Sequence, residues 1–438
     1  MSRRLGGTPR RSKRLAAVIA GLTTIAIIGG ASVAMATEPT PPPTGPLDQA
    51  LAQVPGLPPL SDDDFYQPPA RTEGDVGDII RSRSIVAPAF PEATTQQFMY
   101  VSKNQKGDAV PVTGTLLTSS TAPKKDAPLV VVTPGTRGLG KQCAPSKQFN
   151  LATLDPRAAD YESATYTQYL LRGINVVVTD YVGGGTPLPQ EYLVGRSEGQ
   201  NGLDAVRAAQ RLNPDDAITD ASPVGVSGYS QGGQAAGWVQ ELQPDYAPEI
   251  NLKGAIIDAP VQDMVAQIEH LNGNPTAGAG FGLAGMQGTS DAFGLDIRDY
   301  LTDTGKKVYE RLNASCTVED IAGFGTITTA DVTDPDVLQQ PQFRDALKES
   351  LLGTKKPGAP AYIYHGSADT IVPANFGPAL FSGWCQQGAD VEFTQLPAQE
   401  HLSGNITGTP AAIDWMAKRL AGEPPRSGCV RGSQIPVT

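Results

Sequence analysis

Histidine and cysteine are scarce in this sequence, which has three histidines and four cysteines among its 438 residues. No two cysteines have the C-x-x-C spacing that is typical of zinc sites and thiol redox centres. The sequence therefore predicts no bound metal ion and no cofactor. Only His270, His365 and His401 are available to any reaction that needs an imidazole base.

Basic residues are also scarce beyond the N-terminal 36 residues. Six of the 34 Lys and Arg residues of the chain lie within its first 14 residues: Arg3, Arg4, Arg10, Arg11, Lys13 and Arg14. Of the 34 Lys and Arg, 28 remain against 45 Asp and Glu, which is a formal charge of −17. Such a surface repels phosphate groups, so the charge balance argues against nucleic acid as a partner.

The N-terminus has the residue order of a secretory signal peptide. Its basic segment is followed by an apolar run over residues 15–30 and by the small-residue motif Ala34-Met35-Ala36. The run is shorter than the ~20 residues that a membrane span needs. We therefore expect cleavage near Ala36 and a secreted protein, with an uncleaved anchor as the alternative. In an exported chain four cysteines indicate two disulfide bonds, for which three pairings are open.

The rest of the chain divides by composition and pattern. Residues 37–60 are rich in proline and predict a lead-in outside any core. Residues 61–260 and 357–438 alternate strand-like and helix-like stretches, which indicates an α/β core in two parts. Residues 261–356 interrupt this alternation without a convincing strand, and we predict that they form a helical cap or lid inserted into the core.

Two kinds of strand are predicted. Stretches with alternating character predict antiparallel edge strands at Gln97–Ser102 and Pro111–Thr118. Continuous β-branched runs predict strands buried on both faces of a mostly parallel sheet. These runs are Pro128–Thr133, Ile174–Thr179, Val224–Ser227, Ala255–Ile257 and Ala361–Tyr364. The predicted helices are Glu162–Arg172, Glu198–Leu212 and Gln231–Leu242 in the core, and Asp263–Leu271, Ser290–Leu312 and Pro341–Leu352 in the cap.

A G-x-S-x-G pentapeptide, Gly228 to Gly232, follows one buried strand and precedes a helix. A tight strand-to-helix turn needs small residues on both sides of the serine, because Cβ atoms there would meet neighbouring backbone. The turn exposes the hydroxyl of Ser230, and the first N–H groups of the helix point toward a developing oxyanion. This context predicts that Ser230 is a nucleophile, and the alternative is an ordinary serine in a glycine-rich turn.

Chain order selects the base and the acid. In α/β-hydrolases the acid and then the histidine follow the serine. His401 lies in the predicted loop after the last strand-like run, Val391–Leu396, and has a suitable acid, Asp369, between itself and Ser230. Asp258 is the main competing acid because it also ends a strand, whereas Asp180 fits less well because it precedes the serine. His365 is expected to be a structural histidine with its hydrogen bonds satisfied, and His270 a surface residue of the cap.

The oxyanion should be bound by the backbone N–H of Gln231 and by one N–H from the loop after the first buried strand. In that loop we favour Thr136, with Gly135 as the second candidate. The alternative is that Pro134 and Gly135 form a plain turn.

These segments resemble the secretory lipase family of the lipase A type. The resemblance extends over roughly residues 90–430 and is carried by Leu129–Thr136, Gln142–Ser146, Val176–Tyr181, Tyr192–Gly199, Gly228–Gly233, Tyr364–Asp369, Ile371–Pro373 and His401. It implies an α/β-hydrolase fold with a helical cap before the acid, and activity on carboxylic esters including acylglycerols. It also implies the disulfide pairings Cys143–Cys316 and Cys385–Cys429.

The predicted function is that of a lipase, which hydrolyses acyl esters through an acyl-enzyme. Alternatives are a secreted acyltransferase or short-chain esterase with the same triad, and an extracellular binding module without catalysis. Within the cap, Phe281, Leu283 and Met286 fit equally a lid that touches a lipid surface and a buried linker. A monomer is expected.

Overall fold

The computed structural model describes residues 63–150, 160–212, 217–272, 274, 278–317, 320, 327–334 and 337–432. The predicted signal peptide (1–36) and proline-rich lead-in (37–60) lie outside these ranges. Among the helices in these ranges, none is long and apolar enough to cross a membrane.

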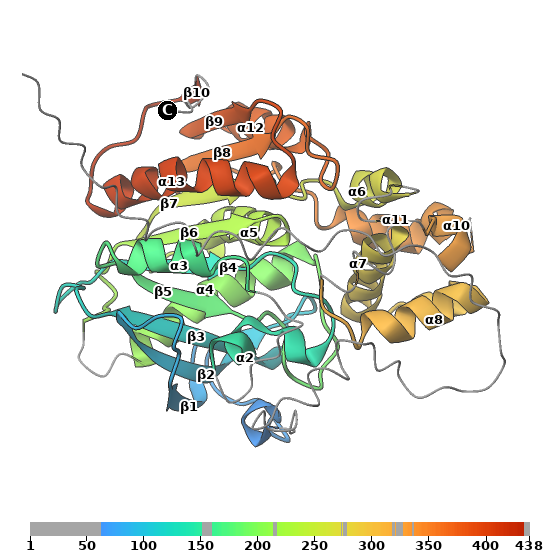
Figure 1. The fold of residues 1–438 in the computed structure, drawn as a ribbon, viewed down its shortest axis with the longest axis horizontal. Coiled ribbons are helices and arrows are strands. Elements are labelled where there is room, and N and C mark those ends of the chain that lie inside the picture. The colour runs from blue at the N-terminus through green and yellow to red at the C-terminus, as the bar shows by residue number, and fades with distance from the viewer. Residues whose placement is uncertain are drawn as a thin grey trace, which may run out of the picture. The chain divides into compact units, whose positions relative to one another are not determined.

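A central sheet of ten strands runs through the described fold (Figure 1), in the order β1-β2-β3-β5-β4-β6-β7-β8-β9-β10. The strands are β1 (Ile79–Ile85), β2 (Ala93–Lys103), β3 (Ala109–Ser119), β4 (Leu129–Thr133), β5 (Asn175–Thr179), β6 (Val224–Tyr229), β7 (Leu252–Asp258), β8 (Ala361–Gly366), β9 (Val391–Leu396) and β10 (Cys429–Arg431). From β5 to β10 all neighbours are parallel, whereas β1, β2 and β3 pair in antiparallel fashion and β3 is antiparallel to β5. The α/β-hydrolase fold class is therefore confirmed, with the antiparallel strands at one edge as predicted.

Two edge strands, β1 and β10, were not predicted from the sequence. β1 has no apolar run, and from Arg81 to Ile85 its residues alternate between half-buried and exposed. β10 has only three residues and adds to β9 beside the disulfide of Cys429. Neither strand is long or apolar enough to give a pattern in the sequence.

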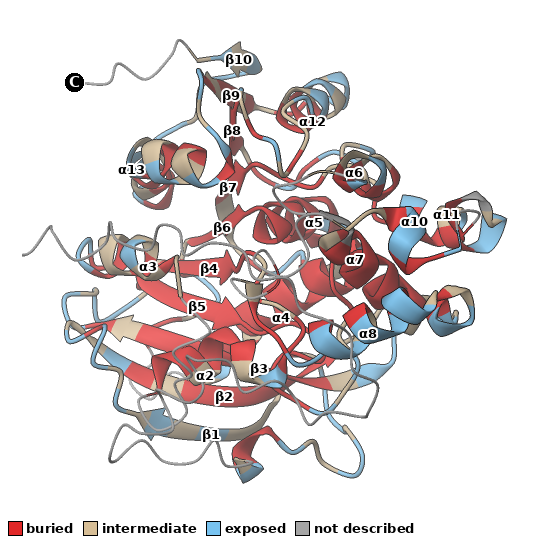
Figure 2. Ribbon diagram, turned by 45° about the vertical axis from the view of Figure 1, so that its right-hand side comes forward, coloured by how far each residue is buried: buried red, intermediate tan, exposed pale blue. Residues whose placement is uncertain are grey.

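Helices cover both faces of the buried strands in the middle of the sheet, which are mostly red in Figure 2. In β4 and β5, Val131 and Val177 point to a core shared with α4 and α5, while Val130 and Val176 point to a core shared with α3 and α13. Since both faces are covered, every residue of β4 and β5 is buried.

The helices of the core are α2 (Pro145–Phe149), α3 (Ser163–Leu170), α4 (Gly195–Leu212), α5 (Gln231–Tyr246), α12 (Phe376–Gln386) and α13 (His401–Leu420), with the 3-10 turns η1 (Asp64–Tyr66) and η2 (Lys141–Cys143). Those of residues 261–356, called the insert below, are α6 (Met264–Leu271), α7 (Gly278–Phe293), α8 (Asp303–Leu312), α10 (Thr329–Val332) and α11 (Pro341–Lys348), with η3 (Ile297–Tyr300) and η4 (Val337–Gln339). The insert lies between β7 and β8 and projects to one side of the sheet in Figure 1.

One predicted helix of the insert was wrong. Ser290–Leu312 is not continuous, because α7 ends at Phe293 and α8 begins only at Asp303. Gly294 follows α7 with a φ of 71°, a conformation that terminates helices, and the side chain of Thr302 caps α8 by accepting from the N–H of Gly305 at 2.9 Å. The segment predicted as a lid or a buried linker lies in α7, where Leu283 and Met286 are fully buried and Phe281 is half-buried.

Candidate active site

Ser230 lies at a sharp turn between β6 and α5. Its φ of 61° and ψ of −118° are strained for a residue with a Cβ, and the next residue, Gln231, begins the helix. The flanking glycines permit this turn, because a Cβ at Gly228 would overlap the carbonyl of Gly232, and a Cβ at Gly232 would overlap the carbonyl of Thr133. The turn is also held by a hydrogen bond of 3.0 Å from the N–H of Ser230 to the carbonyl of Asp258.

The structure brings the three predicted residues together. The Nε2 of His401 lies 2.9 Å from the Oγ of Ser230, and its Nδ1 lies 2.7 Å from Oδ2 of Asp369. The ring of Tyr229 packs on the imidazole of His401 with 4.7 Å between ring centres. This arrangement can move a proton from the hydroxyl to an imidazole that a carboxylate orients.

His401 was expected in a loop, and this was wrong. It is the first residue of α13, whose N-terminus is closed by a capping box between Glu400 and Ser403. The N–H of Glu400 donates to the Oγ of Ser403 at 2.9 Å. A glutamate as the N-cap residue is unusual, which is why the sequence did not indicate a helix start at this point.

Asp369 is held by four hydrogen bonds. Its Oδ1 accepts from the N–H groups of Ile371 and Val372, each at 2.9 Å, and its Oδ2 accepts from His401 and from His365. Burial would raise the pKa of Asp369, but the hydrogen bonds from the two histidines hold that pKa below its usual range. The carboxylate therefore carries its negative charge beside His401.

The other two candidates for the catalytic acid, Asp258 and Asp180, form hydrogen bonds to residues outside the triad. Asp258 accepts from the Nδ2 of Asn405 at 2.8 Å, and burial raises the pKa of its carboxyl well above the ordinary value. Asp180 accepts from the N–H of Ser146 and the hydroxyl of Thr113, at 2.9 and 2.6 Å. His270 lies on α6, half-exposed, with its Nε2 2.9 Å from the carbonyl of Thr370.

The three residues predicted to bind the oxyanion differ in position and in hydrogen bonding. Gln231 and Thr136 both line the cavity that contains Ser230 and His401. As the first residue of α5, Gln231 has no carbonyl one turn back to accept from its N–H within the helix. The N–H of Gly135 instead donates to Oε2 of Glu162 at 3.1 Å, so Gly135 is wrong as a donor to the oxyanion. The sequence could not show that a buried carboxylate would take this N–H.

Glu198 is a residue of the site that the sequence analysis missed. Its Oε1 accepts from the side chain of Gln231 at 2.6 Å and from the N–H of Leu193 at 2.9 Å. Burial raises the pKa of Glu198 to about 8. It thus ties the residue after the nucleophile to the wall of the cavity, a contact across 33 residues that no local pattern indicates.

The cavity above Ser230 has a volume of about 280 Å³ and a mostly apolar wall. Its apolar side chains come from the core and from α6 and α7 of the insert: Leu193, Val261, Met264, Ile268, Leu271, Phe281, Ile371, Val372 and Leu402. The space suits a hydrocarbon chain with its carbonyl at Ser230.

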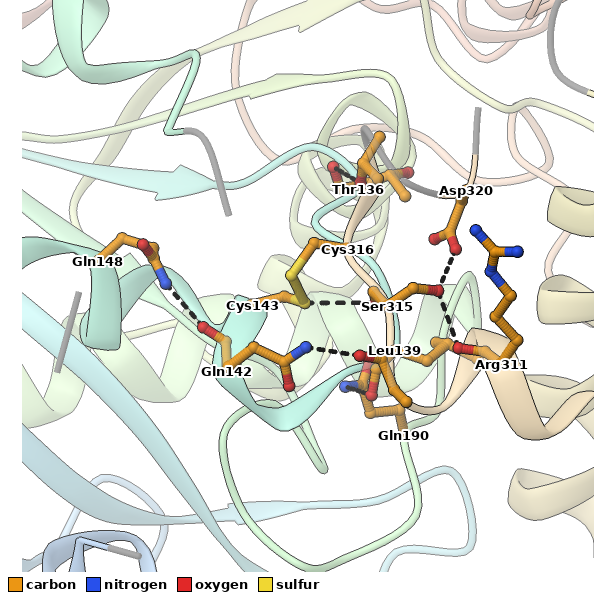
Figure 3. The surroundings of a disulfide bond; sticks show 12 residues. Thr136, Leu139, Gln142, Cys143, Gln148, Gln190, Arg311, Ser315, Cys316 and Asp320 are labelled. Atoms are coloured by element: carbon orange, nitrogen blue, oxygen red, sulfur yellow. Dashed lines mark hydrogen bonds between the residues drawn. A yellow bond between two sulfur atoms is a disulfide. The ribbon is translucent and has the colours of Figure 1, made fainter. Parts of the chain in front are cut away.

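A disulfide connects the loop after β4 to the insert. Cys143 is bonded to Cys316, just after α8, and Cys385 is bonded to Cys429, so both implied pairings are present. Figure 3 shows the first bond among hydrogen bonds that join the same two segments. The Nε2 of Gln142 donates to the carbonyl of Ala314 at 2.7 Å, and the hydroxyl of Thr317 donates to the carbonyl of Thr136 at 2.8 Å. The insert thereby holds the loop that carries the oxyanion candidate Thr136.

Groups of histidine, cysteine, aspartate and glutamate that could hold a metal ion are absent from the described ranges. The expectation of no metal and no cofactor stays a prediction.

The chain is similar to proteins that are named as lipases. The chain is 31% identical over 394 residues to "Lipase 5" of Candida albicans, covering 84% of this chain and 82% of that protein. It is 28% identical to the "Probable inactive lipase MT1628" of Mycobacterium tuberculosis, covering 83% of each. It is 29% identical to the "Secreted triacylglycerol lipase LIP3" of Malassezia restricta, covering 83% of this chain and 80% of that one.

The fold is also that of a solved lipase. Candida antarctica lipase A in its closed state superposes with a TM-score of 0.77 at 24% identity, covering 87% of this chain and 91% of that chain. The family model described as "Secretory lipase" matches residues 149–428. This protein therefore belongs to the secretory lipase family of ester hydrolases with the α/β-hydrolase fold.

Proposed function

We propose that this protein hydrolyses acyl esters with Ser230 as nucleophile, His401 as general base and Asp369 as the acid that orients the base. The observation that carries the proposal is the continuous hydrogen-bonded chain from Ser230 through His401 to Asp369, at 2.9 and 2.7 Å, which opens into an apolar cavity. A serine hydroxyl needs such an adjacent base to become nucleophilic at neutral pH.

The reaction has two halves. The Oγ of Ser230 attacks the ester carbonyl while Nε2 of His401 takes its proton, and the protonated imidazole then gives that proton to the departing alcohol. A water molecule, deprotonated by the same imidazole, attacks the acyl-enzyme and releases the carboxylic acid. Throughout, the ionised carboxylate of Asp369 stabilises the positive imidazole and holds its Nδ1–H.

The negative oxygen of each tetrahedral intermediate is proposed to lie between the backbone N–H of Gln231 and that of Thr136. Both residues line the cavity beside Ser230. The N–H of Gln231 is at the positive end of the α5 dipole, which adds to its attraction for an oxyanion.

A lipid substrate is favoured by the wall of the cavity. It is lined by aliphatic and aromatic side chains, and such a wall binds a long acyl chain better than a short polar ester. One relative bears the name of a secreted triacylglycerol lipase, and acylglycerols are the substrates we propose here. Short-chain esterase activity and acyl transfer to an alcohol use the same residues and are the alternatives.

The insert is proposed to act as a cap that meets the lipid surface, in a monomeric protein released after cleavage near Ala36. The rim of the cavity supports contact with lipid, because Leu402 lines the cavity and is 54% exposed, and Ile406 lies one turn further along α13 and is 64% exposed. Exposed apolar side chains beside an active site are typical of proteins that act at an interface.

The direct test is Ser230→Ala with p-nitrophenyl esters of increasing chain length. Because one relative is named a probable inactive lipase, turnover by the wild-type protein is the first measurement. We expect the variant to lose at least ~1,000-fold in kcat while keeping its thermal unfolding temperature. Labelling of the wild type, but not of the variant, by a fluorophosphonate would identify the nucleophile. Equal rates for the two proteins would refute the assignment, and absence of labelling in the wild type would favour a binding module.

A further inference from the structure

His365 makes a hydrogen bond to the same carboxylate that orients His401. Its Nε2 lies 3.0 Å from Oδ2 of Asp369, and both side chains are completely buried. His365 lies in β8, which leads directly into the loop of Asp369, and its ring lies against α12. The proposed hydrolysis uses Ser230, His401 and Asp369, so this second imidazole has no part in it so far.

The tautomer of His365 follows from its other neighbour. The N–H of Gly377 in α12 donates to Nδ1 of His365 at 3.2 Å. A backbone N–H can only donate, so this Nδ1 carries no hydrogen. The neutral ring therefore bears its hydrogen on Nε2 and donates it to Asp369.

Space around the ring keeps it in this position. A Cβ at Gly377 would lie 3.0 Å from both the Cβ and the Nδ1 of His365, so α12 approaches the ring as closely as a glycine allows. The ring cannot turn away from Asp369 without losing both hydrogen bonds. It is a fixed donor.

Two imidazoles thus share one carboxylate oxygen. Among the described residues, His365 and His401 are the donors to Oδ2 of Asp369, while Oδ1 is bonded by two backbone N–H groups. A second donor on Oδ2 withdraws negative charge from the oxygen that stabilises the imidazolium of His401. It also prevents rotation of the carboxylate, since each oxygen is held by two donors.

We propose that His365 is a positioning residue of the hydrolytic reaction: its hydrogen bond to Oδ2 fixes the carboxylate of Asp369 and reduces the negative charge that His401 experiences. This inference rests on the proposed function. It makes the acid a shared group between two histidines rather than the end of the chain.

Other titratable groups lie near Asp369 and its two histidines. The side chains that face it from neighbouring elements are Tyr229 of β6, Asp258 of β7, His270 of α6 and Glu400 before α13. Of these, Tyr229 stacks on His401 and Glu400 bonds to Thr370, next to the acid. Helix α12 has one residue of a titratable type, Cys385, and it does not titrate because it forms a disulfide bond. These groups are the same in every His365 variant, so a difference in pH profile between two variants comes from the residue at position 365.

Two substitutions separate donation from packing. Glutamine can place an amide N–H where Nε2 lies, whereas methionine has a similar length and no donor. We expect His365→Met to lower kcat by ~10-fold with KM within ~2-fold, because the bond orients the chemistry and not the substrate. We expect the acid limb of kcat/KM to move upward by about half a pH unit, since Oδ2 then attracts a proton on His401 more strongly. His365→Gln should recover most of both changes.

A proton NMR measurement reads the same bond without activity. The sequence has three histidines, so single variants assign the low-field imidazole protons, with His270→Gln as the control. In His365→Met the Nδ1 proton of His401 should move downfield, because its hydrogen bond to Asp369 strengthens when the second donor is removed. In His270→Gln and His365→Gln it should stay near the wild-type position.

The outcomes decide the matter either way. Equal losses in the methionine and glutamine variants would mean that His365 acts by packing alone and would overturn the proposal, as would a folded methionine variant with unchanged kcat, pH profile and NMR position. If the wild type hydrolyses no ester, the proposed function fails, and the position of the His401 proton still tests the shared carboxylate.

Discussion

The side-chain amide of Gln231 donates a hydrogen bond to Glu198, with 2.6 Å between Nε2 and Oε1. Gln231 is the residue whose N–H is proposed to bind the oxyanion, and Glu198 in α4 also accepts from the N–H of Leu193 in the cavity wall. Leu193 has a φ of 59°, a strained conformation for leucine, so this buried carboxyl holds two parts of the site that would otherwise relax.

Glu198→Ala should therefore reduce kcat for ester hydrolysis by ~10-fold and destabilise the fold by ~1–3 kcal/mol, because two buried donors lose their acceptor. Glu198→Gln keeps an acceptor oxygen and should retain activity within ~3-fold. Steady-state kinetics and chemical denaturation of both variants check this. Alanine behaving like glutamine in both measurements would contradict a holding role for Glu198.

The stability of the protein should depend on pH through Glu198. Burial raises the pKa of this carboxyl from 4.5 to about 8, so between these values the folded state keeps a proton that the unfolded chain has lost. Because the folded state binds more protons in this window, its stability falls as pH rises through it. Glutamine has no such proton, so the unfolding temperature of Glu198→Gln relative to wild type should increase from pH 5 to pH 8. A difference that does not vary with pH would show that Glu198 titrates alike in both states.

Asp369→Asn should lower kcat by ~1,000- to 10,000-fold, because an amide neither stabilises the imidazolium nor fixes its tautomer. Asp258→Asn is the matched control: Asp258 lies at the end of β7, bonds to Asn405, and has a raised pKa, so a neutral amide should replace it with little change. Kinetics with a p-nitrophenyl ester compare the two. A larger loss in the Asp258 variant would reassign the acid.

Val261→Phe should alter chain-length preference. Val261 is buried in the wall of the cavity, where a phenyl ring takes up space that a long acyl chain would fill. The ratio of kcat/KM for a p-nitrophenyl palmitate to that for the acetate should fall by ~10-fold. Val86→Phe, at a side chain that is 73% exposed and absent from the cavity wall, serves as the control. A ratio that falls equally in both variants would place the acyl chain elsewhere.

Removal of the Cys143–Cys316 disulfide by two serine substitutions should lower stability by ~2–4 kcal/mol, since the bond closes a loop between residues 173 positions apart. It should also lower kcat, because the bond joins the insert to the loop of Thr136. The Cys385–Cys429 bond joins α12 to β10, away from this loop, and its removal should reduce stability with little change in kcat. Calorimetry and kinetics on both double variants test the difference. Equal effects on kcat would separate the insert from the oxyanion loop.

Local features of the sequence determined the sheet and the nucleophile. The valine runs of β4 and β5 can be buried on both faces only inside a helix-covered sheet. The turn at Ser230 requires glycine at positions 228 and 232, where a Cβ would overlap neighbouring backbone. Chain order then made His401 and Asp369 the candidates to meet the serine. Each of these inferences depends on residues close together in sequence or on the fixed direction of a parallel sheet.

Only the tertiary structure decided which polar groups actually meet. In the folded protein the N–H of Gly135 donates to Glu162, and the side chain of Gln231 donates to Glu198. His365 bonds to the same oxygen of Asp369 as His401 does. Such bonds join residues on separate elements, and their partners are set by a few tenths of an ångström in how helices and strands pack. A sequence pattern fixes which face of an element is buried, but hydrogen bonds in a buried site depend on distances that every packed element helps to determine.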